Sequence, residues 1–534
     1  MKAHTLAITP LAQDDFAHQN LLSSGKNKCQ PNYRSSILRG LLFFLISISF
    51  FYMVIAISAT SDHPPAAQNT GSHFYFDPLL TTPKKLTDTP AQKLPNDQHA
   101  ATCADTPINT QIDGLTLMQA VTLALCHNTQ SRQAWISAQT YAARVGIARS
   151  AYFPSITAST GRARTEQKTV SSNNLWDGTT IDKFTSNKKN ISLNAVLFDF
   201  GARMANVEEA QQMLIAAMAN QDAVLQKVFQ ETVQVYDNAL IAQANFYTSQ
   251  TAKQDAEKIL KSTQALKAHG VGDPTDIFNA QANLARTSRD EIKAKNTTTI
   301  AMGVLANMMG LDARAAFSLA PFQQRGLPDE SMRQAQLLMH EAKDIHPSIT
   351  QARAELSAAQ AKVKSVTASG LPSLSVYAGR YINGQPNAQT TSLQSYETVY
   401  GMTVSIPLFE GFERVYKIKE ARALAAARKI SLEDAELKVN MDIWRCFQEL
   451  KTAYSDLIAT DMVLRGADIV VKATAARYQR GASDVTEWIR ARAALYSAEQ
   501  DHTRAKADWR TNYLKFLASL GKVGFWAVDT ASEN

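Results

Sequence analysis

The chain contains the same strand-to-helix segment twice, and this duplication limits the folds that it can adopt. Residues 403–422 read TVSIPLFEGFERVYKIKEAR, and residues 192–210 read SLNAVLFDFGARMANVEEA. In each segment apolar and polar residues alternate, as in a strand with one apolar face, and a run without proline follows. Arg203 and Arg414 lie at equivalent positions, each four residues after an acidic residue and 211 residues apart.

Two further pairs of segments extend the duplication. Residues 134–155 match residues 352–373, and both segments end in an apolar residue, a proline and a serine. Residues 270–280 match residues 481–491, again at an offset of 211. This period is far too long for the unit of a solenoid, so we interpret it as the duplication of a half-domain.

Each half is predicted to contain two short strands. In the first half they lie near 153–163 and 190–199, and we interpret the polar residues 165–189 between them as a surface loop. In the second half they lie near 372–381 and 399–408. Each pair has an apolar face and a small polar face, as the lipid and lumen sides of membrane-barrel strands do.

Four strands cannot close a membrane barrel, and open strand edges cannot face lipid because their backbone groups would be unpaired. If these strands enter a membrane, several chains must share one barrel, and three chains would supply twelve strands. The alternative is a soluble hairpin that packs on the helices.

Two very long helices are predicted to follow the strand pairs. Residues 202–269 contain neither Gly nor Pro and would form a helix roughly 100 Å long, at about 1.5 Å per residue. The counterpart, residues 412–480, is interrupted only by Gly466. Many of the periodic positions are Ala, which favours a wall of closely packed helices, and an ordinary coiled coil is the alternative.

Shorter helices are predicted beside the long ones. Residues 115–150 show apolar residues at helical spacing and precede Pro154. Short turns end the two long helices and lead into helices at 275–309 and 485–520, which we expect to return antiparallel.

Composition excludes several classes of function. The net charge is +7, and residues 1–58 carry +3 of it. The remaining +4 is mild for this length, and no basic stripe indicates nucleic-acid binding. The chain has no Walker A loop, no HExxH and no GxSxG, so neither an enzyme nor a cofactor is predicted. Its ten His residues lack the paired spacing of ligands, so no metal site is predicted.

The N-terminal region indicates export. Residues 41–59 form an uncharged apolar run that follows basic residues and precedes small ones, which favours an export signal, with a retained membrane anchor as the alternative. Disulfides are permitted in an exported chain. We therefore predict a bond between Cys103 and Cys126, the alternative being two unpaired small apolar residues, and we interpret Cys446 as a buried thiol.

The ordered set of motifs, from about residue 115 to about residue 520, resembles the TolC family of outer-membrane efflux and secretion channels. The segment from Leu115 is similar to the family's opening helix, and Cys126 is similar to the cysteine of members with an N-terminal disulfide. The other matching motifs are LFDFG at 197–201, IPLFEG at 406–411, the helices that end at Pro154 and Pro372, and Tyr478-x-x-Gly481 followed by a Thr-acid pair.

The resemblance implies a mainly α fold with a small β part, in which each half repeats a helix, a strand hairpin and a long helix. It implies a homotrimer with a 12-stranded β-barrel among the lipids of the outer membrane of a Gram-negative cell, and a 12-helix α-barrel in the periplasm. The expected divisions are an export signal with a polar extension (1–58), a flexible lead-in (59–111), a first repeat (112–310), an equatorial linker (311–342), a second repeat (343–521) and a tail (522–534).

The function implied by the resemblance is that of a passive duct. Such a duct docks on a periplasmic adaptor (membrane fusion) protein and on an inner-membrane ABC or proton-driven transporter. It passes secreted proteins, as in type I secretion, or small toxic molecules, as in efflux. The competing hypothesis is a periplasmic adaptor or coiled-coil scaffold anchored by the N-terminal apolar segment; two long hairpins and two separate strand pairs favour the channel.

The resemblance also assigns a gate at the turns of the helical hairpins. Tyr478 matches the family's gating tyrosine, and Asp276, beside Thr275, matches its acidic partner, so a Tyr478–Asp276 bond is expected. The family's gating arginine falls on Ser483, which implies a weaker lock, and Arg477 and Arg480 are the candidates to replace it.

A constriction and an adaptor contact are implied close to the gate. Glu487 matches the first carboxylate of the family's constriction and Arg490 replaces the second, so mixed charge is expected there. The alternative is that these are solvated residues at helix ends. The turn residues expected to contact the adaptor are Gly270, Val271, Gly272, Gly481, Ala482 and Ser483.

Overall fold

A computed structural model describes Leu79 and residues 111–173, 176–270, 273–320, 346–385, 393–480 and 482–521. The chain divides into two compact units, Met1–Gly71 and Ser72–Asn534, and every described residue lies in the second. The predictions for residues 1–58, for nearly all of the lead-in, for most of the linker and for the tail 522–534 lie outside the described residues.

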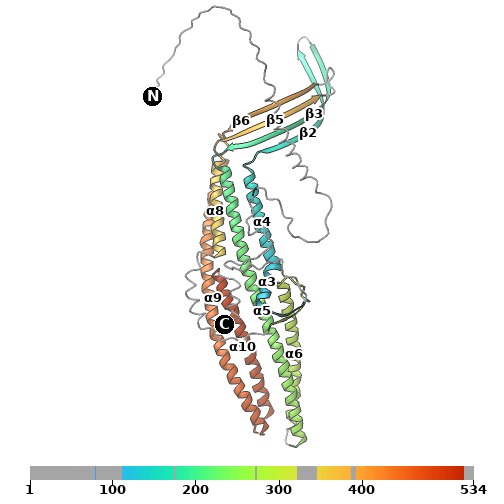
Figure 1. The fold of residues 1–534 in the computed structure, drawn as a ribbon, viewed down its shortest axis with the longest axis vertical. Coiled ribbons are helices and arrows are strands. Elements are labelled where there is room, and N and C mark those ends of the chain that lie inside the picture. The colour runs from blue at the N-terminus through green and yellow to red at the C-terminus, as the bar shows by residue number, and fades with distance from the viewer. Residues whose placement is uncertain are drawn as a thin grey trace, which may run out of the picture. The chain divides into compact units, whose positions relative to one another are not determined.

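The described part is mainly helical, and its element order confirms the duplication (Figure 1). The two long helices have the same length, 67 residues, and the two returning helices also have the same length, 35 residues. The helices are α3 (Leu117–His127), α4 (Thr129–Ser150), α5 (Ala202–Ala268), α6 (Pro274–Met308), α8 (Pro347–Ala368), α9 (Glu413–Gln479) and α10 (Val485–Ser519).

The long helices follow from composition and capping. Neither contains Pro, and Gly466 in α9 has open space where its Cβ would be, so it costs α9 only about 1 kcal/mol. At the start of α6 and α10, Asp273 accepts a hydrogen bond from the Thr275 amide (2.8 Å) and Asp484 accepts one from the Glu487 amide (2.7 Å).

The helical region predicted over 115–150 is present, but it is divided. A strand, β1 (Gln111–Leu115), precedes it, and the region itself forms α3 and α4, which are separated by Asn128. The Asn128 side chain caps α4 by accepting a hydrogen bond from the Gln130 amide (2.8 Å), a local alternative to continued helix. β1 pairs in parallel with β4 (Ala316–Leu319), which lies in the predicted linker.

Four strands form a second sheet in the order β2-β3-β5-β6, with antiparallel pairing throughout. They are β2 (Ser155–Asn173), β3 (Trp176–Phe198), β5 (Ser373–Gln385) and β6 (Leu393–Ser405).

The interpretation of residues 165–189 as a loop is wrong, because β2 and β3 continue through them in unbroken register to Asn173 and Trp176. Backbone hydrogen bonds between strands need no apolar side chains where both faces of a hairpin are polar, so the loss of apolar alternation did not end the strands. In the second half, Asn383 and Gly384 belong to β5, although they were expected in the loop.

Tight bends join the strands to the long helices. Gly201 has φ +88° and Gly411 has φ +59°, values that favour glycine, and each bend also places a phenylalanine, Phe200 or Phe412, in the left-handed region. The repeated Leu-Phe-acid motif therefore marks the point where a strand changes into a helix.

The main apolar core lies where α3 and the β1–β4 pair meet the middle of α5 and α9 and the ends of α6 and α10. Phe229, Leu305 and Phe516 are fully buried in it, and the Tyr236 hydroxyl donates to the Leu115 carbonyl (2.9 Å). This core fixes the two helical hairpins, α5–α6 and α9–α10, relative to one another.

The cysteines are only partly within the described residues. Cys126 is disulfide-bonded, but its partner lies outside them, so the pairing with Cys103 stays a prediction. Cys446 is a free thiol, and it is half-buried rather than fully buried, with its pKa raised by burial.

Candidate functional site

The two helical hairpins meet near their turns in a small apolar cluster that contains one buried residue from each of the four helices. Its members are Ile259 of α5, Ala280 of α6, Tyr478 of α9 and Val485 of α10. The ring of Tyr478 lies 5.3 Å from that of Trp488, and only 6% of the tyrosine is exposed. Tyr478, the predicted gating residue, therefore holds the hairpins together by packing.

The expected hydrogen bond between Tyr478 and Asp276 is not formed in this structure. Asp276 acts on the tyrosine through its charge: the pKa of Tyr478 is raised by burial and then by Asp276. The pKa of Asp276 is itself raised, by burial first and then by Asp273 and Asp484. Asp276 is thus repelled by Asp273 and Asp484, and no hydrogen bond joins it to Tyr478.

The Glu487 carboxylate is bound within its own hairpin. Arg477 of α9 forms an ion pair with it (Nη1 to Oε1, 2.9 Å), and the Ser483 hydroxyl donates to its other oxygen. Arg490 is exposed and forms no ion pair with another described residue. Glu487 is therefore paired, whereas Arg490 forms no ion pair with a described residue, and their role in a constriction stays a prediction.

The predicted adaptor-contact turns are only partly described. Gly270 has φ +75°, and Ala482 is exposed, with its amide bonded to the Arg477 carbonyl (3.0 Å). Thr275 is exposed, whereas Ser483 is half-buried. Val271, Gly272 and Gly481 lie outside the described residues.

A polar cluster farther from the turns links α5 to α10, and the sequence analysis missed it. The Asp255 carboxylate accepts a hydrogen bond from the Tyr496 hydroxyl (2.6 Å) and forms ion pairs with Arg492 (3.2 Å) and Lys258 (3.1 Å). Burial acts to raise the pKa of Asp255, but these partners outweigh it and lower the pKa. The signal was available, since Asp255 lies beside Ala256 in the buried stripe of α5.

A second polar link between α5 and α10 lies next to the main core. Asp237 is almost fully buried and accepts hydrogen bonds from Arg510 and from the Thr511 hydroxyl (2.6 Å). Burial raises its pKa and these partners oppose that effect. Removal of one partner from such a buried pair is strongly destabilising, so this link anchors the hairpins.

The sheet has one apolar and one polar face. Residues directly opposite in an antiparallel pair share a face. The apolar face carries Ile156, Ala158, Ile191, Leu193, Ala195, Leu374, Val376, Ala378, Tyr400, Met402 and Val404. The other, mainly polar face carries Thr157, Ser159, Asn190, Ser192, Asn194, Ser375, Gly401 and Thr403, together with Val196, Tyr377, Tyr381 and Val399. Tyr400 is 83% exposed and Met402 71%, so the described residues leave the apolar face uncovered.

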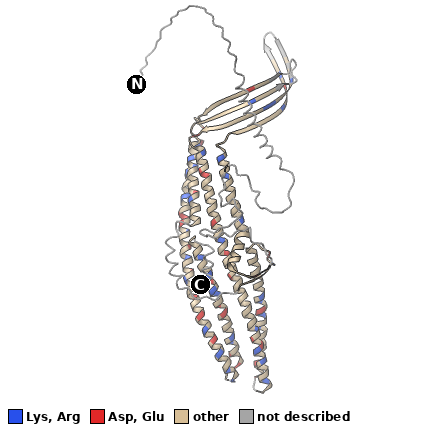
Figure 2. Cartoon of the chain, viewed as in Figure 1, with Lys and Arg blue, Asp and Glu red and all other residues tan. Residues whose placement is uncertain are grey.

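The ends of the strands next to the helices form a charge-free band. Residues 155–161, 190–198, 373–379 and 398–405 contain no Asp, Glu, Lys or Arg. Figure 2 shows the charged positions of the sheet only farther from the helices. At seven to nine residues per strand, the band approaches the about 9–11 residues of a membrane-spanning strand.

Exposed aromatic side chains gather where the band meets the helices. Phe198 and Phe200 lie 4.8 Å apart between ring centroids, and Phe409 and Phe412 lie 5.4 Å apart. All four are at least half exposed. Aromatic girdles of this kind border the apolar band of membrane strands.

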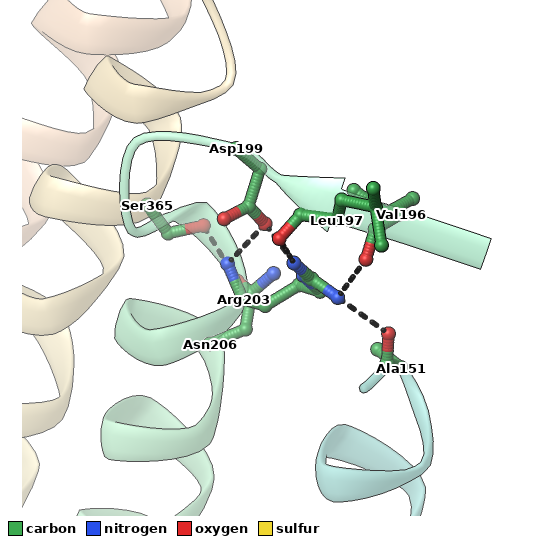
Figure 3. A network of polar contacts seen from close by, with 7 residues as sticks. All are labelled: Ala151, Val196, Leu197, Asp199, Arg203, Asn206 and Ser365. Atoms are coloured by element: carbon green, nitrogen blue, oxygen red, sulfur yellow. Dashed lines mark hydrogen bonds and ion pairs between the residues drawn. The ribbon is translucent and has the colours of Figure 1, made fainter. Parts of the chain in front are cut away.

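The duplicated arginine joins the sheet to the helices (Figure 3). Arg203 forms an ion pair with Asp199 (2.9 Å) and donates to the carbonyls of Ala151 (3.3 Å), Val196 (2.7 Å) and Leu197 (3.2 Å). It thereby connects the end of α4, the end of β3 and the start of α5.

Arg414, the equivalent residue, makes fewer bonds. It donates to the Pro407 carbonyl (3.3 Å), forms an ion pair with Glu410 (3.1 Å) and packs on Gly370 after α8. The repeated basic residue in the sequence thus marks two versions of one junction.

No described helix is both long enough and apolar enough to cross a membrane. Among the described residues, no group of three or more His, Cys, Asp and Glu side chains is arranged to hold a metal ion.

Comparison with known proteins identifies the family. Residues 120–311 and 338–522 match the family model described as "Outer membrane efflux protein". The chain is 31% identical to Protein CyaE of Bordetella pertussis, over 78% of this chain and 86% of that protein. It is 25% identical to the alkaline protease secretion protein AprF of Pseudomonas aeruginosa, over 70% of this chain and 78% of that protein.

A solved structure supports the fold. The Campylobacter jejuni CmeC outer membrane channel superposes with a TM-score of 0.64 at 16% identity, over 89% of this chain and 98% of that chain. The TolC-like fold class is thereby confirmed, and the channel is favoured over the adaptor or scaffold hypothesis. The chain belongs to the outer membrane efflux protein family, as an outer-membrane export channel protein with a periplasmic helical domain.

Proposed function

We propose that three copies of this chain form one channel, which conducts exported protein from an inner-membrane transporter to the cell exterior. Within the protomer, β2 and β6 are the edges of the four-stranded sheet. Open edges are not tolerated in lipid, so edge β6 of one copy pairs with edge β2 of the next. Three sheets then close a barrel of twelve strands, and the uncovered apolar face turns to lipid.

The exposed surface of α9 supports assembly of the helices as well. Its large apolar side chains recur at spacings of three, four and seven residues or multiples of seven, and more than a third of each is exposed. These residues, named here the α9 stripe, are Ile430, Leu437, Met441, Trp444, Ile458, Met462 and Ile469. Such spacing is typical of packing against another helix, and no described helix of the protomer covers these residues. A neighbouring copy is the partner that a symmetric trimer provides.

The links between α5 and α10 set the width of the tunnel at the helix turns. In this proposal, the channel opens when α9 and α10 move away from α5 and α6. Such a movement separates Tyr478 from Ile259, and Asp255 from Tyr496 and Arg492. The Asp237–Arg510 pair next to the main core stays closed and acts as the pivot. The gate thus combines an apolar lock at the turns with a polar lock above it.

The partners follow from the family and from the names of relatives. A periplasmic adaptor docks at the turns that include Gly270 and Ser483, and an ABC or proton-driven transporter supplies the energy. Relatives of this chain include the alkaline protease secretion protein AprF and the proteases secretion protein PrtF of Dickeya chrysanthemi. These names favour a secreted protein as the cargo over a small toxic molecule.

The charge-free band beside two hairpins of long helices is the observation that carries this proposal. Its test is purification in mild detergent, with the mass measured by light scattering, followed by conductance in planar bilayers. We expect a mass of three chains and discrete channels of low conductance. A monomer, or a trimer without conductance, contradicts the proposal. Loss of a protein from the culture supernatant of a strain that lacks the gene tests the cargo.

A further inference from the structure

Four basic side chains lie on the apolar face of the sheet immediately beyond the charge-free band. They are Arg162 and Arg164 of β2, Lys189 of β3 and Arg380 of β5. All four are exposed. None forms an ion pair with another described residue. We name this set the basic step.

The register makes the basic step continuous. Arg380 lies opposite Ile191, so it is the diagonal neighbour of Lys189, and Lys189 lies opposite Thr160, so it is the diagonal neighbour of Arg162. Diagonal neighbours on one face are about 7–8 Å apart. Arg164 follows Arg162 two residues along the same strand. Four positive charges therefore lie side by side across three strands.

The charges around this set differ from those within it. Two residues beyond Arg164 and on the same face, Glu166 is paired with Lys183 at 3.0 Å. On the polar face, Lys188 and Glu397 supply charges of opposite sign. Arg162, Lys189 and Arg380 have no acidic residue directly opposite or diagonal to them among the described residues of their face, and the one acidic residue beside Arg164, Glu166, is paired with Lys183. Like charges at this separation repel one another, so the arrangement favours an external anion.

The position of the basic step along the strands, relative to the charge-free band, indicates where that anion lies. Lys189 shares a row with Ile382 and Tyr396, and Tyr396 is 62% exposed. An exposed tyrosine at the edge of an apolar band is typical of the boundary between hydrocarbon and headgroups. The helices lie on the periplasmic side, so the basic step is at the opposite, outer boundary. Arginine forks match phosphate oxygens, and a lysine adds a point charge.

We propose that the basic step binds the phosphate groups of anionic lipid in the outer leaflet of the outer membrane. This inference rests on the proposed function, because it requires the apolar face to turn to lipid. The lipid neutralises the four charges and fixes the depth of the barrel. Phosphate of the bulk solution is excluded as the main ligand, since the side chains stand directly above an apolar surface that acyl chains cover.

The test measures retention of a defined lipid by the purified full-length trimer. Diphosphoryl lipid A is titrated into detergent solution, and bound lipid is counted by native mass spectrometry. We expect R162Q/K189Q/R380Q to bind at least tenfold more weakly than the unaltered protein. K188Q, the matched control on the polar face, should stay within twofold. Binding by the unaltered protein should weaken as salt rises, and the triple variant should show a shallower salt dependence.

Several results would overturn the proposal. They are no lipid bound by the unaltered protein, a triple variant within twofold of it, or an equal loss in K188Q. If the triple variant does not assemble, R162Q is measured instead, and we expect it to bind lipid A about threefold more weakly. Arg162 lies at the end of the four-stranded part of the sheet, so its replacement should leave assembly intact.

Failure of the proposed function is recognised separately. Conductance of the unaltered protein is recorded in bilayers of phosphatidylcholine, which carries no net charge. Channels there, together with a lost lipid preference in the triple variant, support both proposals. Absence of channels contradicts the proposed function, whatever the lipid measurement gives.

Discussion

α5 and α9 are duplicates of equal length, yet the fold uses them differently. α5 packs against α3, α4, α6, α8 and α10, whereas α9 packs against α8 and α10. Polar residues such as Gln221, Asp237 and Asp255 are buried along α5. Along α9 the only buried polar residue among those described is Thr474, and the α9 stripe is exposed.

This difference shows how two copies of one helix can have different roles, one inside the protomer and one at its surface. The copy that became central acquired polar partners inside the protomer, because a buried carboxylate needs them. The copy at the surface has apolar residues that the described residues leave uncovered, and large exposed apolar surfaces mark interaction sites. The strand hairpins diverged in the same way: β2 and β3 have 19 and 23 residues, while β5 and β6 have 13 each.

The largest expected effect is loss of the trimer when the α9 stripe is disrupted. Leu437→Asp places a carboxylate in the α9 stripe, and its burial against a neighbouring copy costs several kcal/mol, of the order of 4. We expect loss of the trimer in light scattering, with helix content unchanged by circular dichroism. Ser431→Asp, at an exposed position on another side of α9, is the control and should stay trimeric. A stable Leu437→Asp trimer would remove α9 from the interface.

The next prediction compares the stability contributed by the two arginines, Arg203 and Arg414, that join the sheet to the long helices. Arg203→Ala removes the ion pair with Asp199, which keeps only the hydrogen bond from the amide of residue 203, and it removes the side-chain donor of three carbonyl oxygens. We expect it to lower the free energy of unfolding by about 2–4 kcal/mol. Arg414→Ala should cost only about 1 kcal/mol, since its bonds are fewer and more exposed. Thermal unfolding of both variants checks this order. Equal losses would mean that the junctions are equivalent.

A third effect concerns the link from α5 to α10. Asp255→Asn keeps the shape but removes the charge that holds Arg492 and Lys258, so we expect single-channel conductance to rise about twofold or more. Asp434→Asn is the control, because its partner Lys438 lies on the same helix and not across the hairpins. Conductance equal to that of the unaltered protein would exclude Asp255 from the gate. The same recording on Asp276→Ala tests whether the turn carboxylate contributes.

The pH dependence separates these two carboxylates. Asp276 has a raised pKa, so its repulsion is lost as pH falls through that pKa, and conductance should not rise there. Asp255 has a lowered pKa, so the stability that it contributes is present above the usual Asp pKa of about 3.9 and is lost as pH falls through its lower folded value. Conductance recorded from pH 7 to pH 3 should therefore increase only at the acid end. The increase should be absent in Asp255→Asn.

The smallest effect tests the longer strand hairpin. β3 pairs with β5 only from Asn187 to Phe198, so the extension of β2 and β3 supports nothing else in the described sheet. Replacing residues 165–184 by Asn-Gly joins Arg164 to Thr185, which are already paired. The Glu166–Lys183 pair that is lost is solvent-exposed. We expect a stability change within about 1 kcal/mol in thermal unfolding. A larger loss would show that the extension is structural.

The positions of many site residues could be predicted from the sequence, but the hydrogen bonds and ion pairs that they form could not. The position of Tyr478 in the turn region was predictable from its motif, while its burial against Ile259 and Val485 depends on where four helices meet. The Tyr478–Asp276 bond was expected by resemblance alone, and the repulsion from Asp273 and Asp484 is a property of the folded arrangement. Asp255 could have been suspected as a charged residue in a buried stripe, but not its partner Tyr496, 241 residues away.

Features that depend on neighbouring residues follow from the sequence alone. The absence of Gly and Pro specifies the length of α5, alternation specifies the inner ends of the strands, and the repeated Leu-Phe-acid motif specifies where strand becomes helix. Tertiary structure alone decided which copy of each duplicated element became central, how far β2 and β3 continue, and what each buried charge binds. Those outcomes arise from burial and pairing between distant segments, and local propensity contains no information about them.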